Sequence, residues 1–287
     1  MPSAGSNPTV RRWELAARLR QLRLEAGRSI EEAAGELMCS VAKISRLETG
    51  GRGVQPRDVR DLCRFYGVPD GVRDELIQAA QEARKPGWWQ DFRTLEEQVA
   101  TLIGLEDAAG EVSVVDALRM PGLFQTEEYS RALIPRLRPE GELTRHWIDE
   151  TVESRRRRQA RIQSGALGFH SVMDEAVLRR PVGDAGIMRR QVERLSVEAR
   201  RDNVTLQIIP FGRGPHPGLE GSFQLLSFPE GRLADMVFVE GLVGQFLIDK
   251  PAEVQHYHQI FGDLAQRFAL SPDDTVAWLK EFLEEFI

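Results

Sequence analysis

The chain has 287 residues, of which 29% are charged, and it carries a formal net charge of -6. This length is typical of two domains. No stretch approaches the ~18 apolar residues of a membrane span, and the start of the chain has no apolar signal core, so we expect a cytoplasmic protein that does not enter membranes. The polar residues 1–10 predict a disordered N-terminus.

The first predicted helix runs to Ala26. Its residues Leu15, Leu19 and Leu22 recur at helical spacing, and Gly27 ends it. Two further helices complete the same domain downstream. One opens at Pro56 and ends at Gly67, and another spans residues 71–83.

Residues 29–50 predict two short helices joined by a tight turn. Ser29 is a favourable N-cap for the first helix, and Ser40 for the second. Val41, Ile44 and Leu47 are predicted to turn inward, and Gly50 ends the second helix. Such a pair is either a plain hairpin of a helical core or an element whose second helix enters a DNA major groove. The flanking helices, which give five within residues 11–84, favour the DNA-binding interpretation.

Two side chains on the outer face of the second helix suit DNA contacts. Arg46 can pair bidentately with guanine, and Lys43, a flexible point charge, suits a phosphate. Residues 11–66 hold twelve Lys and Arg against eight Asp and Glu, a net +4, whereas the remainder carries -10. This asymmetry is expected when only the N-terminal end meets a polyanion. The two cysteines, Cys39 and Cys63, are interpreted as buried, reduced packing residues, with a redox-sensing pair as the alternative.

Residues 14–67 resemble the lambda-repressor-like, or XRE-type, helix-turn-helix family through Ala-Lys-Ile-Ser-Arg-Leu-Glu-Thr-Gly at residues 42–50. The resemblance implies that Ser40, Val41, Ala42 and Arg46 face the bases, and that Lys43 and Arg52 face phosphates. Two positions depart from the family pattern. Ile30 replaces a glutamine that helps to hold a phosphate, and Met38 replaces the glycine of the turn, where a left-handed backbone strains a side chain.

A second domain is predicted from residue 85 to residue 287. Pro86 and Gly87 break the fifth helix, and at least one of the adjacent Trp88 and Trp89 is expected to be buried at a domain junction or a dimer contact. Residues 88–163 read as mainly helical, with a strand-like run at residues 112–118. Thr126 is predicted to cap a helix after the turn at residues 121–122.

The helix at residues 144–163 contains four consecutive arginines at positions 155–158. They point around the whole helix, so the simplest interpretation is a solvated helix with ion pairs such as Glu153 to Arg157. The alternative is an anion or acidic-partner site, for which Arg155, Arg157, Arg158 and the loop residue His216 are the candidates. It requires two or more of the arginines to converge with another element.

Residues 164–250 read as mixed α/β. Strands at 166–173 and 204–211 flank a helix at 187–201, which predicts parallel pairing. Further strands are predicted at 222–228, at 236–240 and in the apolar run to residue 248, and helices at 252–268 and 272–286 end the chain. The fold class is therefore α+β, a five-helix bundle followed by a domain with a small sheet and terminal helices.

This second domain is similar to that of WhiJ-like actinobacterial regulators, often described as antitoxin-like. The resemblance rests on Gly87-Trp-Trp, residues 103–106, Pro121-Gly-Leu-Phe-Gln-Thr-Glu-Glu-Tyr, the arginine-rich helix with Gln159, residues 174–180 and 204–211, and Gly221-Ser-Phe. It implies a regulator encoded beside a small partner protein.

The sequence favours a homodimeric, sequence-specific regulator that binds double-stranded DNA. It contains no nucleophile elbow, phosphate loop or His-Glu-x-x-His motif, and His256 and His258 are poorly spaced for a metal, so we expect no catalysis, cofactor or metal site. Two alternatives remain open. One is an interaction protein that neutralises a small basic partner, and the other is a small-molecule sensor coupled to DNA binding.

Overall fold

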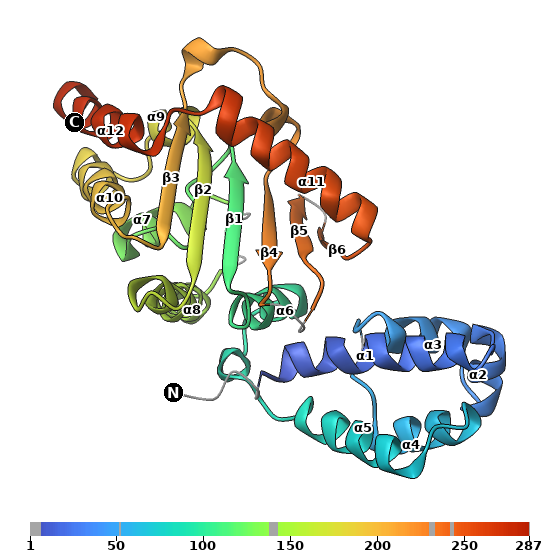
Figure 1. Cartoon of the computed structure of the whole chain (residues 1–287). Coiled ribbons are helices and arrows are strands. Elements are labelled where there is room, and N and C mark those ends of the chain that lie inside the picture. Colours follow the sequence, from blue (N-terminus) through green and yellow to red (C-terminus); the bar gives the residue numbers. More distant parts are fainter. Residues whose placement is uncertain (1–6, 52, 138–142, 230–232, 242–243, 287) are drawn as a thin grey trace. The chain divides into compact units, whose positions relative to one another are not determined.

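The computed structural model describes residues 7–51, 53–137, 143–229, 233–241 and 244–286, and it divides the chain into two compact units (Figure 1). The first consists of Met1–Asp91 with Glu230–Leu233, and the second of Phe92–Pro229 with Ala234–Ile287. The first unit thus extends beyond the predicted boundary at residue 84 and includes Trp88 and the buried Trp89. Within the described part of the chain, no helix is long and apolar enough to cross a membrane.

The first unit is the predicted five-helix bundle. Its helices are α1 (Pro8–Glu25), α2 (Ile30–Glu36), α3 (Val41–Glu48), α4 (Pro56–Phe65) and α5 (Asp70–Glu82). Leu19, Ile44 and Leu62, from three different helices, lie in one buried core. Residues 8–10 are helical, which corrects their predicted disorder, because Asn7 caps α1 and Val10 is buried.

The cysteines of this unit are free. Cys63 is buried in the core, and Cys39 is only half-buried against it. Burial raises the pKa of the Cys63 thiol to about 11, so that at neutral pH it stays a neutral packing group.

The second unit is built on one six-stranded sheet. Its strands are β1 (Glu111–Asp116), β2 (Gly168–Asp174), β3 (Val204–Ile209), β4 (Phe223–Ser227), β5 (Met236–Gly241) and β6 (Gly244–Ile248). They lie in the order β3-β2-β1-β4-β5-β6. Strands β1, β2 and β3 are parallel, which confirms the parallel pairing predicted for β2 and β3, and the remaining pairs are antiparallel. Because β1 lies inside the sheet, residues 88–163 do not form a separate helical part.

Helices flank this sheet and cover one of its edges. They are α6 (Glu97–Glu106), α7 (Glu127–Leu133), α8 (Arg145–Gln163), α9 (Ala176–Arg179), α10 (Ala185–Glu198), α11 (Pro251–Asp263) and α12 (Pro272–Phe286), with a π-helical turn at Leu264–Phe268 and 3-10 turns at Ile134–Arg136, Phe211–Arg213 and Pro217–Glu220. A further 3-10 turn, Trp88–Asp91, belongs to the first unit. Val254 and Phe261 of α11 pack on one sheet face, across which α11 lies in Figure 1. Thr275 of α12 accepts a hydrogen bond from the backbone of Ile208, so the β3 edge is covered.

Candidate nucleic-acid interface

Helices α2 and α3 begin at the predicted caps. The Ser29 hydroxyl accepts a hydrogen bond from the Glu32 backbone N–H at 3.1 Å, and the Glu32 carboxylate accepts one from the Ser29 backbone at 2.8 Å. The Ser40 hydroxyl accepts from the Lys43 backbone at 3.2 Å. At the other end of α3, Gly50 has φ 68°, and a Cβ there would lie 2.7 Å from the Trp13 ring. These groups fix both ends of the helix pair.

The residues that the family resemblance assigned to the bases lie on the surface, at the start of α3 and along it. Ser40, Val41, Ala42 and Arg46 are exposed. The prediction that Val41 turns inward is wrong, since its exposed fraction is 41%. The inward stripe is formed by Ile44, Leu47 and Glu48, which leaves Val41 at its margin. Arg52 lies outside the described residues.

Arg46 is held along the surface of α3 and its charge is available. Its Nε donates to the Ala42 carbonyl oxygen at 3.3 Å. Among the described residues no carboxylate forms an ion pair with it. An exposed, uncompensated guanidinium on the second helix of the pair has the chemistry needed to recognise guanine.

Lys43, predicted to contact phosphate, forms an ion pair within the protein. Its Nζ lies 3.0 Å from Asp58 Oδ2 of α4, and the Asp58 side chain is only 8% exposed. Arg57 Nε lies 3.4 Å from the other carboxylate oxygen. Lys43 therefore joins α3 to α4, a role that its position on the outer face of α3 did not indicate.

A buried ion pair fixes α3 against α1. Arg23 donates from Nε and Nη2 to the two carboxylate oxygens of Glu48, at 2.7 and 2.9 Å, and from Nη1 to the Arg28 carbonyl oxygen at 2.8 Å. The hydrogen bond to Glu48 outweighs burial and raises the pKa of Arg23. The sequence pattern did not indicate this pair. It could have been inferred from spacing, because Glu48 follows Ile44 by four residues and therefore lies on the same inward face of the helix.

Met38 occupies the strained position expected from its departure from the family pattern. Its φ is 47°, the only positive value among the described non-glycine residues, and its side chain is 93% exposed. A left-handed conformation costs a side chain with a Cβ about 1–2 kcal/mol, and Met38 contributes little burial in return.

Replacing Met38 by glycine is therefore expected to stabilise the bundle by about 0.5–1 kcal/mol, after allowance for the greater backbone entropy of glycine in the unfolded chain. The measurement is urea denaturation of the full chain. Met38→Ala is the control, because it keeps the Cβ and should show no such gain. A glycine variant no more stable than the alanine variant would show that the turn is not strained.

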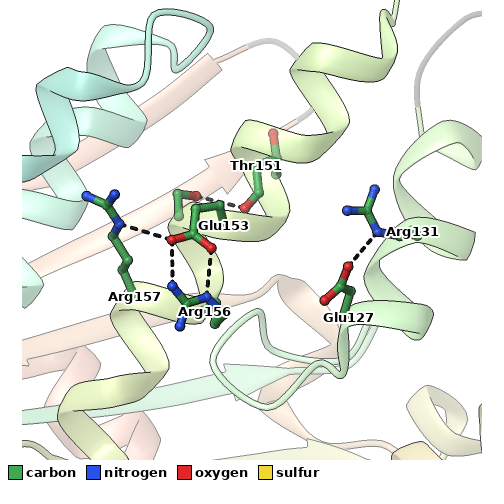
Figure 2. Close-up of polar contacts among 7 residues, drawn as sticks. Glu127, Arg131, Thr151, Glu153, Arg156 and Arg157 are labelled. Atoms are coloured by element: carbon green, nitrogen blue, oxygen red, sulfur yellow. Dashed lines mark hydrogen bonds and ion pairs between the residues drawn. The ribbon is translucent and has the colours of Figure 1, made fainter.

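In the second unit, the arginines of α8 divide into an exposed pair and two that face the protein. Arg156 Nε and Arg157 Nε lie 2.7 and 3.2 Å from the Glu153 carboxylate, which they share (Figure 2). These bonds lower the pKa of Glu153 to about 2. The predicted Glu153 to Arg157 pair is present, and Arg157 also lies over the Phe92 ring.

Arg155 and Arg158 do not fit the interpretation of a fully solvated helix. Arg158 binds both carboxylate oxygens of the buried Glu106 at the end of α6, at 2.6 and 2.7 Å. Arg155 donates to Gln125 Oε1 at 2.6 Å. The helical period explains why these two arginines face the protein while Arg156 and Arg157 are exposed. Residues 155 and 158 are about one turn apart and therefore share the inner face of α8.

His216 lies in a different place from the arginines. Its Nε2 is 3.0 Å from Asp174 Oδ2 at the end of β2, and its side chain is buried. Arg155, Arg157, Arg158 and His216 thus have separate partners and do not form one site.

Three buried glutamines hold the loop between β1 and α7. Gln125 Nε2 donates to the Met120 carbonyl oxygen, Gln159 Nε2 to the Gly122 and Gln125 carbonyls, and Gln191 Nε2 to the Phe124 carbonyl. This gives the Pro121-Gly-Leu-Phe-Gln-Thr segment a structural role. Thr126 caps α7 as predicted.

Comparison with known families gives two matches. A helix-turn-helix domain matches residues 14–76, the part that contains α2 and α3. A domain of unknown function, DUF5753, matches residues 99–281, which is more than half of the chain. No curated protein and no solved structure matches the chain.

Proposed function

The chain belongs to the DUF5753 family and carries an N-terminal helix-turn-helix domain, and on this basis we propose that it is a sequence-specific transcription regulator controlled through its C-terminal domain. The observation that carries the proposal is the surface of α3. There Arg46 is exposed, has no ion-pair partner among the described residues, and lies among the small side chains of Ser40, Ala42 and Ser45. Small neighbours allow the helix to approach base edges, and the guanidinium supplies the recognition.

The proposal includes a homodimer. A single module of this size makes few base contacts, and tight, specific binding usually combines two half-sites. Two α3 helices about 34 Å apart would read successive turns of the same DNA face. Lys43 can contact a DNA phosphate only while its charge is partly neutralised by Asp58, whose Oδ2 lies 3.0 Å from the Lys43 Nζ.

The proposed role of the second unit follows its charge and its resemblance to WhiJ-like regulators. Residues 92–229 and 234–287, which form this unit, hold 22 Lys and Arg against 30 Asp and Glu, a formal net charge of -8, which suits a small basic partner protein encoded nearby. We propose no catalytic role. The competing proposal, a small-molecule sensor, is supported by charged side chains near the carboxyl end of β1, which include the buried Asp116 and the ion pair of Arg119 with Glu240.

Replacing Arg46 by alanine is expected to weaken binding to the preferred duplex by about 1–3 kcal/mol and to relax preference at one base position. Fluorescence anisotropy with a duplex selected from a random pool measures both effects. Arg73→Ala is the matched control, because Arg73 lies on α5 and pairs with the exposed Asp70 and Asp74. Equal affinity and base preference for the Arg46 variant and the wild type would remove α3 as the reading helix.

A further inference from the structure

Charged side chains gather beyond the carboxyl end of β1. Asp116, the last residue of that strand, is buried, and its Oδ1 accepts hydrogen bonds from the backbone of Leu118 and Arg119 and from the Ser222 hydroxyl. The Arg119 side chain pairs with Glu240 of β5. The carboxyl end of a parallel strand is where ligands bind in open α/β sheets.

Arg155 supplies this cluster with a cation whose charge is poorly compensated. Its hydrogen bond to Gln125 engages a neutral oxygen that also accepts from the Ser130 hydroxyl. Among the described residues no carboxylate lies within ion-pair distance of it, whereas each of the three arginines that follow it has one. Burial, Arg158 and Arg119 lower the pKa of Arg155 to about 10. A desolvated guanidinium is stabilised by an anion that can accept hydrogen bonds from several of its N–H groups.

Two buried amide oxygens, from Gln224 and Gln245, lie on the face of the sheet to which Asp116 and Glu240 also point. The Oε1 atoms of Gln224 and Gln245 are inaccessible to solvent and have no hydrogen-bond partner among the described residues. Gln245 pairs in register with Glu240, and Gln224 with the residue two before Asp116. Since side chains alternate along strands, all four point to one face. Buried acceptors without donors are uncommon and need an explanation.

We propose that this cluster binds a small anionic metabolite, with a carboxylate or phosphate group on Arg155 and Arg119 and hydrogen-bond donors directed to Gln224 and Gln245. Arg119 exchanges its partner Glu240 for the ligand, and Arg155 gains the anionic acceptor that it lacks. Control of DNA binding by such a ligand rests on the proposed function, but the binding step itself does not.

The test is thermal unfolding of the full chain at fixed ionic strength, with chloride replaced by inorganic phosphate, acetate or N-acetylglycine. We expect a saturable rise in Tm with phosphate or with the carboxylates, whichever anion the site takes. If carboxylates bind, N-acetylglycine should bind more tightly than acetate because it adds an N–H donor. Arg155→Met should abolish the rise. Arg156→Met should retain it, because Arg156 is exposed on the same helix and is paired with Glu153.

A second variant tests the exchange without removing an arginine. Glu240→Gln should bind the same probe about threefold more tightly, because Arg119 loses a competing, partly exposed carboxylate. No saturable effect of any probe, an effect that survives Arg155→Met, or an unchanged affinity in Glu240→Gln would overturn the proposal. Should Arg155→Met not fold, the Glu240 variant decides. Since no DNA is present, failure here is distinct from failure of DNA binding.

Discussion

Replacing Arg23 by alanine is expected to destabilise the helix-turn-helix bundle by about 3–5 kcal/mol. The change leaves the Glu48 carboxylate, with a side-chain exposure of 5%, without its bidentate partner, and it removes the donor to the Arg28 carbonyl oxygen. Stability of a small domain is commonly about 5–15 kcal/mol, so the loss is a large part of the total. Hydrogen exchange of the α1 and α3 amides in the full chain measures it locally.

The same pair permits a matched control. In the double variant Arg23→Met with Glu48→Leu, no charge is left buried, and much of the stability should return, since apolar residues of similar volume often replace a buried ion pair without loss. If Arg23→Ala exchanges as slowly as the wild type, the pair does not hold α3 against α1. If the double variant is no better than the single one, packing around Arg23 matters more than charge.

Replacing Arg158 by alanine should destabilise the second unit by about 3–5 kcal/mol, because Glu106 is 3% exposed and loses both hydrogen bonds from the guanidinium. The neighbouring Arg156→Ala should cost roughly 0–1 kcal/mol, since the Arg156 side chain is 69% exposed. Urea denaturation of the two variants compares adjacent arginines in one helix. Equal effects would contradict the division of α8 into an inner and an exposed face.

Local pattern predicted most of the elements. Ser29, Ser40 and Thr126 cap helices where the sequence indicated, and the change of period after residue 163 located β2 and β3. These features depend on near neighbours in the chain, which a sequence displays directly. The strained turn at Met38 was predictable for the same reason, because a residue other than glycine at the turn position is visible in the sequence itself.

Long-range partners were not predictable in this way. Lys43 and Asp58 are separated by 15 residues, and Arg23 and Glu48 by 25. A charged residue on a helix reads equally well as solvated or paired until the packing of a second helix is known. The central position of β1 in the sheet could not be predicted for the same reason, because its partners β2 and β4 lie far from it in the sequence.

The central claim is that the chain reads DNA sequence through α3. Selection from a random pool of duplexes by the full-length protein tests it most directly, with the Arg46→Ala and Arg73→Ala variants run in parallel. The predicted result is an enriched motif of two half-sites about one helical turn apart, which Arg73→Ala reproduces and in which Arg46→Ala loses preference at one position of each half-site. A pool that shows no enriched sequence with the wild-type protein would contradict the account.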